Sequence, residues 1–252
     1  VRKRGGCKKD RCEGAERARV LTYRQLTGEV NVGGSTTSSK VVRLGSGGQS
    51  IDFGFYQRHV AGYPLGGFWG LPLLGYGDAN GDGLISASEI TLGTEKVFQG
   101  NPIPTKQASL NNSFTLLNGR VRLGSQFDYR GGYTVDNSIE NFRCSSVLNC
   151  RGLVDPTAPL KEQALAQAVI AGGGNNFAFF EPGWFIKLRE LSLTFYAPNS
   201  VARALRAGSA SLTFAGPNLA TIPHYPGADP EVNPFGQSNF PRPHSEPQPQ
   251  LR

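Results

Sequence analysis

Residues 78–89 have the residue types and the spacing of a calcium-binding loop. They read Asp-Ala-Asn-Gly-Asp-Gly-Leu-Ile-Ser-Ala-Ser-Glu, which fits the twelve-residue pattern D-x-[DN]-x-[DN]-G-x₅-E. Calcium prefers oxygen ligands, and such a loop supplies them at alternating positions around one ion. The predicted ligands are the side chains of Asp78, Asn80, Asp82, Ser86 and Glu89 and the backbone carbonyl of Leu84.

The flanks of this loop do not predict the two helices of a helix–loop–helix hand. The upstream stretch Gly-Leu-Pro-Leu-Leu-Gly-Tyr-Gly cannot continue as a helix, and the downstream stretch is short. We therefore expect a structural calcium clamp on a surface loop. The alternative is a glycine-rich turn whose carboxylates face water.

Four cysteines form two pairs that are close in sequence, Cys7 with Cys12 and Cys144 with Cys150. The spacing allows two short-loop disulfides in an oxidising compartment, and free thiols are the alternative. Neither pair has CxxC spacing and the three histidines are scattered, so we expect no zinc site. The common hydrolase, metalloprotease and nucleotide-binding motifs are absent from the sequence, so we do not expect an enzyme.

The clearest strand signal covers residues 120–129, where apolar side chains alternate with charged or polar ones. This length, with aromatic residues at one end, is typical of a tilted strand in an outer membrane. A half-buried strand in a soluble sandwich is the alternative. The same alternation covers residues 184–195, but its parity changes after Glu190, which predicts a β-bulge. The candidates for the polar, lumen-facing side are Arg120, Arg122, Asp128, Lys187 and Arg189.

One helix is predicted, over about residues 156–171. Asp155 is the expected N-cap, Pro156 suits the first turn, and Gly172–Gly174 should end the helix. Its apolar stripe is small, so we expect it to lie in a loop.

Composition narrows the class of protein. The 252 residues include 33 Gly and 17 Pro, the hydrophobic fraction is 38%, and no stretch is apolar enough for a transmembrane helix. Nearly all of the net charge of +7 lies in the first 24 residues. We therefore expect a nearly neutral β-rich body after a basic leader, residues 1–40. Because that leader has few aromatic residues, we do not expect nucleic-acid binding.

Several motifs, in order, resemble the C-terminal part of SusC/RagA-like TonB-linked outer-membrane proteins. The similar segments are residues 62–70, 78–83, 92–93, 100–104, 116–133, 181–195, 215–219 and 225–233. The resemblance covers about residues 41–243. It implies an all-β fold, an incomplete antiparallel transmembrane β-barrel segment of about eight to ten strands with long loops and one short loop helix. The strands and loops would occupy residues 41–216, and residues 217–252 would be a proline-rich C-terminal segment.

The resemblance also implies a function, which is uptake of oligosaccharides, peptides or similar nutrients through a bacterial outer membrane. The implied partners are outer-membrane lipid, the remainder of the barrel and its plug, a SusD-like lipoprotein and the TonB–ExbB–ExbD complex. The sequence shows no plug domain, TonB box or signal peptide. We therefore expect a fragment of a TonB-dependent receptor that does not transport alone. The alternative is a secreted or surface calcium-binding β module, such as an adhesin or a carbohydrate-binding domain.

Overall fold

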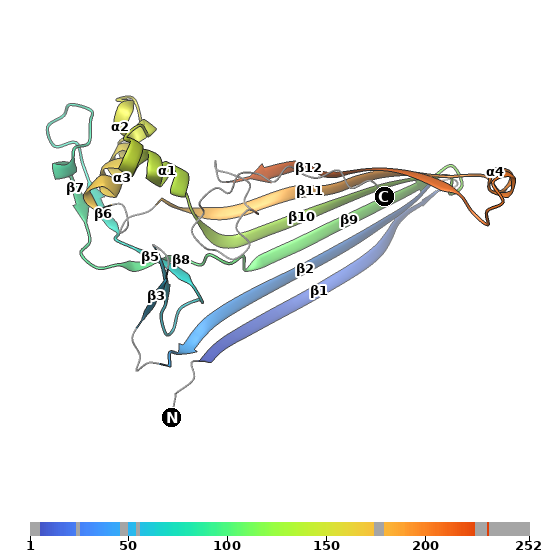
Figure 1. Cartoon of the computed structure of the whole chain (residues 1–252), viewed down its shortest axis with the longest axis horizontal. Coiled ribbons are helices and arrows are strands. Elements are labelled where there is room, and N and C mark those ends of the chain that lie inside the picture. The colour runs from blue at the N-terminus through green and yellow to red at the C-terminus, as the bar shows by residue number, and fades with distance from the viewer. Residues whose placement is uncertain are drawn as a thin grey trace.

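The computed structural model describes residues 6–23, 26–45, 50–53, 56–173, 179–224 and Glu231. Its largest element is a six-stranded antiparallel sheet with the strand order β1-β2-β9-β10-β11-β12 (Figure 1). The strands are Gly6–Tyr23 (β1), Leu26–Arg43 (β2), Lys106–Leu116 (β9), Val121–Asp136 (β10), Phe180–Tyr196 (β11) and Ser211–Pro223 (β12). The predicted all-β antiparallel fold class is confirmed.

The register of the sheet gives it two different faces. Leu193 of β11 lies opposite Leu123 of β10 and Phe214 of β12. The next residue, Thr194, lies opposite Arg122 and Thr213. Since directly opposed residues in a sheet point to the same side, large apolar side chains collect on one face and polar ones on the other. We call these the apolar face and the polar face.

A bulge at Arg189 keeps this sorting intact along β11. Pairing with β10 passes from Glu190 directly to Leu188, and pairing with β12 is interrupted at the same point. One extra residue reverses the parity of a strand, so Leu188 and Leu191 both lie on the apolar face despite their odd separation. The bulge predicted from the parity change is confirmed.

The basic leader is not separate from the strands. Residues 6–43 form β1 and β2, which pair with each other along almost their whole length, and β2 also pairs with β9. On this hairpin, Arg17 and Arg19 lie 2.6 and 3.6 Å from the carboxylate oxygens of Glu29. The expected domain boundary at residue 40 is therefore wrong. β1 carries polar residues on both faces, so it lacks the apolar alternation that would have predicted it.

The expected boundary at residue 217 is wrong as well, because β12 continues to Pro223. Residues 225–230 and 232–252 of the predicted proline-rich segment lie outside the described residues.

Two small sheets lie beyond one end of the long strands, which we call the loop end (left in Figure 1). The first contains Ile51–Phe53 (β3), Gln57–His59 (β4), Gly67–Gly70 (β5) and Val97–Gly100 (β8), and the second contains Leu73–Tyr76 (β6) and Ile90–Leu92 (β7). The sequence predicts about eight to ten barrel strands. Some of the strands included in that number lie in these small sheets instead. The main sheet has six strands among the described residues.

Short helices complete the loop end and the opposite end of the sheet. They are Ala87–Glu89 (η1), Ser138–Phe142 (α1), the π-helical turn Arg143–Val147 (η2), Arg151–Val154 (α2), Leu160–Ala171 (α3) and Asn199–Ala204 (α4). Within the described part of the chain, no helix is both long and apolar enough to span a membrane.

The predicted loop helix exists as α3, but it begins later than predicted. Pro159 is its N-cap residue, and Gly172 ends it as expected. Asp155 does not cap α3, because its carboxylate accepts hydrogen bonds from the backbone N–H and the hydroxyl of Thr157, at 2.9 and 2.6 Å. These bonds form a turn between α2 and α3.

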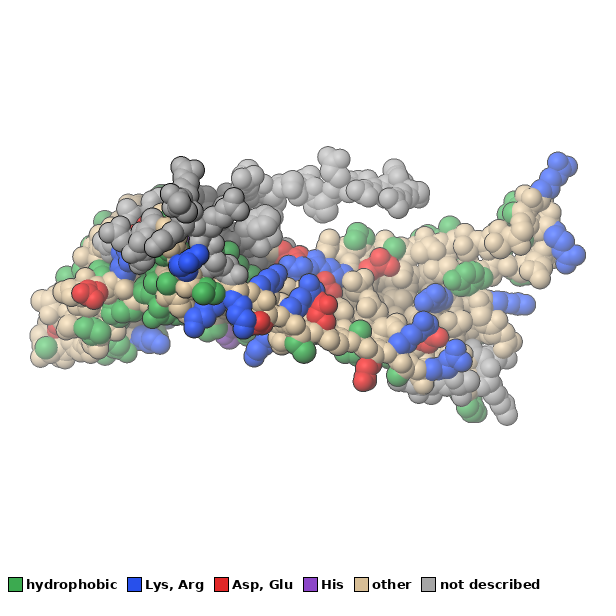
Figure 2. Space-filling view, turned by 90° about the horizontal axis from the view of Figure 1, so that it is seen from below, with side chains coloured by type: hydrophobic (Ala, Val, Ile, Leu, Met, Phe, Trp, Pro, Cys, Tyr) green, Lys and Arg blue, Asp and Glu red, His purple; other side chains and the backbone are tan. Residues whose placement is uncertain are grey.

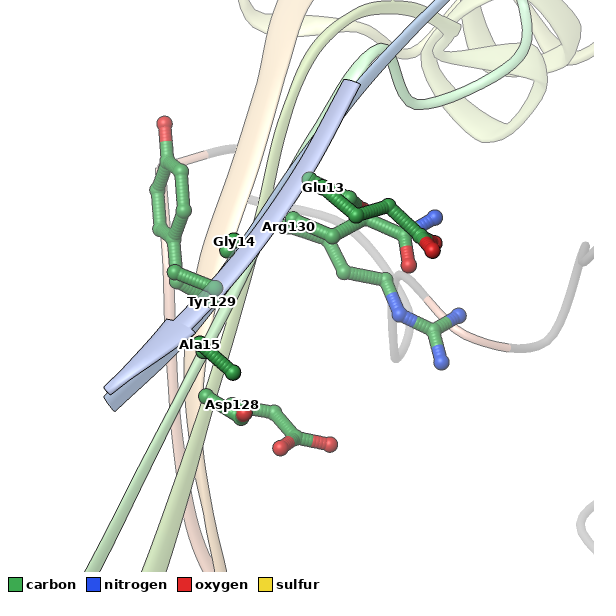
Figure 3. A pocket seen from close by; sticks show the side chains of 12 residues that line it. Glu13, Gly14, Ala15, Asp128, Tyr129 and Arg130 are labelled. Carbon is green, nitrogen blue, oxygen red and sulfur yellow. The ribbon is translucent and has the colours of Figure 1, made fainter. Parts of the chain in front are cut away.

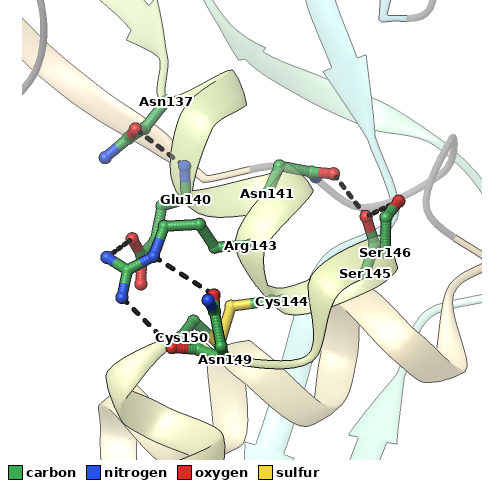
Figure 4. The surroundings of a disulfide bond; sticks show 9 residues. All are labelled: Asn137, Glu140, Asn141, Arg143, Cys144, Ser145, Ser146, Asn149 and Cys150. Carbon is green, nitrogen blue, oxygen red and sulfur yellow. Dashed lines mark hydrogen bonds and ion pairs between the residues drawn. A yellow bond between two sulfur atoms is a disulfide. The ribbon is translucent and has the colours of Figure 1, made fainter.

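A disulfide between Cys144 and Cys150 lies at the centre of the helical part of the loop end (Figure 4). Both cysteines are buried, and they pack with Ala166, Ala168 and Val169 of α3. Arg143 braces the same turn, since its guanidinium donates to the side chain and the backbone carbonyl of Asn149. The segment is thus held by a covalent bond and by a small apolar core.

The other predicted cysteine pair is wrong. Cys12 is a free, exposed thiol in β1, and the side chain of Cys7 lies outside the described residues. Five residues of extended strand separate their Cα atoms by about 16 Å. A disulfide spans at most about 7 Å between Cα atoms.

Candidate functional site

The strongest cluster of charged side chains lies on the polar face, where β10 and β11 pair. Asp128 of β10 lies directly opposite Lys187 of β11. Arg189, the bulge residue, donates from Nε to Oδ2 of Asp128 at 2.8 Å. At this point in the sheet the polar face carries Asp128 and Lys187, and the bulge adds Arg189 as a third charged side chain.

Glu231, which follows β12 in the sequence, contacts both of these strands. Its Oε2 accepts hydrogen bonds from Nζ of Lys187 at 2.8 Å and from Nη1 of Arg189 at 2.6 Å, and its Oε1 pairs with Nη2 of the same guanidinium. Arg130 lies 3.6 Å from Oε1. One carboxylate thus bridges three cations on two strands, and the two oxygens that meet Arg189 form a bidentate pair.

This network is only partly open to solvent. Lys187 is 6% exposed, and the side chain of Glu231 is 21% exposed. The hydrogen bonds from Arg189 are the main reason that the pKa of Glu231 is lowered to about 2, and Lys187 lowers it further. The carboxylate is therefore ionised at any physiological pH and stabilises the cations around it.

A hollow of about 420 Å³ lies on the sheet beside this cluster. It is lined by Glu13, Gly14, Ala15, Gly33, Gly34, Ser35, Gln107, Ala108, Ser109, Asp128, Tyr129 and Arg130. Figure 3 shows Glu13, Asp128 and Arg130 pointing to one side of the strands and Tyr129 pointing to the other. Seen from the side on which β1 lies, basic and acidic side chains gather along the middle of the molecule (Figure 2).

The structure brings together most of the residues predicted to face a lumen. Arg122, Asp128 and Lys187 share the polar face, and Arg189 reaches it from the bulge. Arg120 lies in the exposed turn directly before β10, where its carbonyl still accepts a hydrogen bond from the N–H of Tyr196 at 2.8 Å.

Sequence reasoning missed two members of this cluster. Arg130 continues the polar alternation of residues 120–129 by one more step, so period two would have found it. Glu231 lies in a segment with no strand signal. Only its place in the 225–233 motif marked that segment as notable, and no local pattern predicts its contact with β11.

The predicted calcium loop connects β6 with β7 at the loop end. Oδ1 of Asp78 accepts backbone hydrogen bonds from Gly81 and Asp82, and Oδ2 accepts one from Gly83, at 2.8, 3.1 and 2.9 Å. Gly83 has φ = +79°, which favours glycine at this turn. The first carboxylate of the loop is thus fixed by its own backbone.

The last carboxylate of the loop closes it from the other end. Glu89 accepts hydrogen bonds from the N–H of Ala79 at 2.9 Å, from the N–H of Ser86 at 2.9 Å and from the hydroxyl of Ser86 at 2.8 Å. These bonds, led by the one from the Ser86 backbone, lower the pKa of Glu89 and keep it ionised. The predicted first and twelfth ligands therefore both accept hydrogen bonds from the backbone of the same loop.

A buried glutamine of α3 holds this loop against the helical part of the loop end. Gln163 is 3% exposed. Its side-chain oxygen accepts from the N–H of Ile85 at 2.9 Å, and its nitrogen donates to the carbonyls of Gly83 and Ala158 at 3.3 and 2.9 Å. The loop is therefore a fixed part of the structure rather than a free hairpin.

The donor set of this loop suits calcium, although its oxygens are spread out. Within the described ranges, one group of His, Cys, Asp or Glu side chains brings three possible ligand atoms within 4.8 Å of one another. It is Glu140, Cys144 and Cys150, and the disulfide occupies both cysteines. The carboxylates of Asp78, Asp82 and Glu89 would have to draw closer around an ion. Asn80 lies between them, with its side-chain nitrogen 2.9 Å from Oδ2 of Asp82.

Comparison with solved structures shows which fold this is. Structures titled "Structure of the RagAB peptide transporter" superpose with a TM-score of 0.65 at 15% sequence identity, over 90% of this chain and 27% of the solved chain. The chain shares the fold of one part of that transporter. Two further structures, of the RagAB peptide importer in the closed-closed and open-open states, give TM-scores of 0.62 at the same identity.

The chain spans only about a quarter of the length of the RagAB chains that it matches. No protein-family model matches the sequence, and no curated protein matches it. The likeness therefore rests on the arrangement of strands and loops.

Proposed function

We propose that this chain supplies part of the wall of a TonB-dependent outer-membrane transporter for nutrients such as peptides or oligosaccharides, and that it does not transport alone. The observation that carries this proposal is the two-faced sheet, whose fold matches part of a peptide transporter. The faces differ in the way that lipid on one side and water on the other would require.

The apolar face supports contact with lipid. Phe214 of β12 is 59% exposed, and Leu212 and Ile222 on the same face are similarly exposed. An exposed apolar surface of this kind is uncommon on a monomer in water, where it marks an interaction site. Outer-membrane strands present such a face to the hydrocarbon.

The polar face supports contact with a water-filled interior. Its most buried charges are paired with one another, in the cluster of Asp128, Lys187, Arg189 and Glu231. The proposal includes outer-membrane lipid, the remaining wall and plug, a SusD-like lipoprotein and TonB–ExbB–ExbD as partners, in a bacterial outer membrane. The proposed partners follow from the RagAB-like fold and from the sequence motifs together.

Tryptophan quenching by brominated lipid tests which face meets lipid. Phe214→Trp and Thr213→Trp are matched variants, because the two residues are adjacent on β12 and point to opposite faces. Each is made in a Trp69→Phe/Trp184→Phe background and reconstituted in lipid vesicles. We expect strong quenching at position 214 and weak quenching at position 213. Equal quenching at both positions, or a monodisperse chain that needs neither lipid nor detergent, contradicts the proposal.

We also propose that residues 78–89 bind one structural calcium ion. The supporting observation is that Asp78 and Glu89, the first and last predicted ligands, both turn their carboxylates toward the loop backbone. Calcium should raise the melting temperature of the chain, because a ligand that binds only the folded state stabilises it.

Two ligand variants and one control test the calcium site. Asp78→Ala and Glu89→Ala should each abolish the calcium-dependent rise in melting temperature. Glu95→Ala, an exposed acid outside the loop, should retain it. If Asp78→Ala and Glu89→Ala respond to calcium as the wild type does, the site is elsewhere. A chain that is soluble without detergent and responds to calcium would instead favour a secreted calcium-binding module.

A further inference from the structure

A second cavity, also of about 420 Å³, opens at the loop end between β6, α3 and the start of β11. We call it the β6 groove. Its lining includes Leu73, Leu74, Lys161, Leu165, Phe179 and Glu181. Its volume lies within the range of about 300–1,000 Å³ that is typical of small-ligand sites.

One side of this groove is the open edge of a strand. β6 pairs with β7 only, so within the described ranges its other edge has no strand beside it. Pairing with β7 also skips Leu74, which is 65% exposed. Backbone N–H and C=O groups on such an edge are ready to pair with another extended chain.

The remaining walls combine apolar side chains with one charge of each sign. Leu165 and Phe179 are apolar and partly buried. Lys161 comes from the first turn of α3, and Glu181 comes from the second residue of β11. No ion pair joins these two charges in the described part of the chain. Oε1 of Glu181 accepts a hydrogen bond from the side-chain nitrogen of Asn137 at 3.3 Å, and this neutral donor leaves the charge of Glu181 available to a cation on a ligand.

The open edge is also rigid. Leu73 at the start of β6 packs against the apolar core around the disulfide. At the other end of β6, the N–H of Gly77 donates to the carbonyl of Glu89 at 3.1 Å. A binding edge that is already ordered loses little conformational freedom when a ligand binds.

We propose that the β6 groove binds an extended peptide, which adds to the outer edge of β6 as a third strand. One carboxylate of the peptide meets Lys161 and one cation meets Glu181, while its side chains lie against the apolar wall. This proposal rests on the proposed transport function and narrows its substrate to peptides. A strand edge recognises an amide backbone, which a peptide has and an oligosaccharide lacks.

The first test uses the unaltered chain in detergent micelles and a fluorescein-labelled heptapeptide, Lys-Val-Thr-Val-Thr-Val-Glu. Two further peptides carry N-methyl groups on alternate amides, in complementary positions. Because only every second N–H of an added strand faces β6, one methylated peptide should bind at least tenfold more weakly and the other about as well as the parent. Fluorescence anisotropy gives all three dissociation constants. Maltoheptaose should not displace the peptide.

The second test changes the protein. Leu74→Pro removes the N–H of the residue that the pairing with β7 skips, and it should weaken binding at least tenfold. Leu74→Ala is its control and should change binding less than threefold. Lys161→Glu should weaken binding about fivefold, and a peptide whose terminal Glu is replaced by Lys should not suffer that loss.

Several results would overturn the proposal. They are absence of binding up to 1 mM peptide, equal loss for both methylated peptides, unchanged binding by Leu74→Pro, and displacement by maltoheptaose. The methylated peptides need no variant, so a folding defect in Leu74→Pro does not obscure the answer. Lipid quenching at position 214 is measured separately, so failure here and failure of the wall proposal are distinguishable.

Discussion

Replacing Glu231 by Gln should weaken the contact between this side chain and the cations of the polar face. The substitution keeps the size of the side chain and removes its charge. Lys187 and Arg189 then lose the carboxylate that bridges them, and Arg189 keeps its bond to Asp128. Because Lys187 is almost fully buried, losing this carboxylate weakens the compensation of its charge.

The pKa of Glu231 sets a ceiling on this effect. Lowering a pKa from its usual 4.5 to about 2 corresponds to at most about 3.4 kcal/mol of stability, at about 1.4 kcal/mol per tenfold change in the dissociation constant. The carboxylate is about one-fifth exposed, and solvent screens such a pair. We therefore expect Glu231→Gln to lower the free energy of unfolding by about 1.5–2.5 kcal/mol at pH 7.

The pH dependence has a definite sign. The pKa of Glu231 is lower in the folded state, so its stabilising contribution is complete above about pH 4.5 and is lost as the pH falls toward 2. The wild type should lose stability in that window relative to Glu231→Gln, which has no carboxylate to protonate there.

Denaturant unfolding of the reconstituted chain at several pH values measures both effects. Glu190→Gln is the matched control, because Glu190 is an exposed acid of β11, the strand that carries Lys187 and Arg189, and has no ion pair among the described residues. It should change the free energy of unfolding by less than about 0.5 kcal/mol. If Glu231→Gln behaves like this control at pH 7, or if the two proteins lose stability in parallel below pH 4.5, the bridging role is refuted.

Three further predictions concern other parts of the chain. Gln163→Ala should destabilise the chain by about 1–3 kcal/mol and speed hydrogen exchange in the calcium-like loop, because it leaves a buried amide without an acceptor; normal exchange would contradict this. Cys144→Ser/Cys150→Ser should cost about 2 kcal/mol and speed proteolysis of the helical segment. Phe214→Arg should cost about 2–4 kcal/mol in vesicles and Thr213→Arg much less; equal costs would mean that the faces do not meet different solvents.

The sequence predicted the elements whose side chains alternate. Period two identified the strand of residues 120–129, and the parity change after Glu190 identified the bulge that the structure places at Arg189. Helical spacing identified α3 and its end at Gly172. In these segments the polarity of each side chain predicts which face of the element it lies on, so the local sequence pattern agrees with the position in the structure.

The sequence did not predict the elements whose positions depend on contacts between residues far apart in the chain. β1 has charges on both faces, and its strand structure depends on its pairing with β2. The contact of Glu231 with β11 joins residues more than forty positions apart. The start of α3 was misplaced because Asp155 can cap a helix or fold a turn with Thr157, and only the tertiary structure decides between them.

The bulge at Arg189 also limits which insertions and deletions the gene can tolerate. Deleting one residue from β11 on either side of it would move every residue between the deletion and the strand end to the opposite face. Phe195, Leu193 and Leu191 would then turn toward the polar side, or Lys187 would turn toward the apolar side. Since both neighbouring strands are in register with the bulge, compensation would need changes of length in β10 and β12 as well. Homologous sequences should therefore show substitutions in this strand but a constant number of residues.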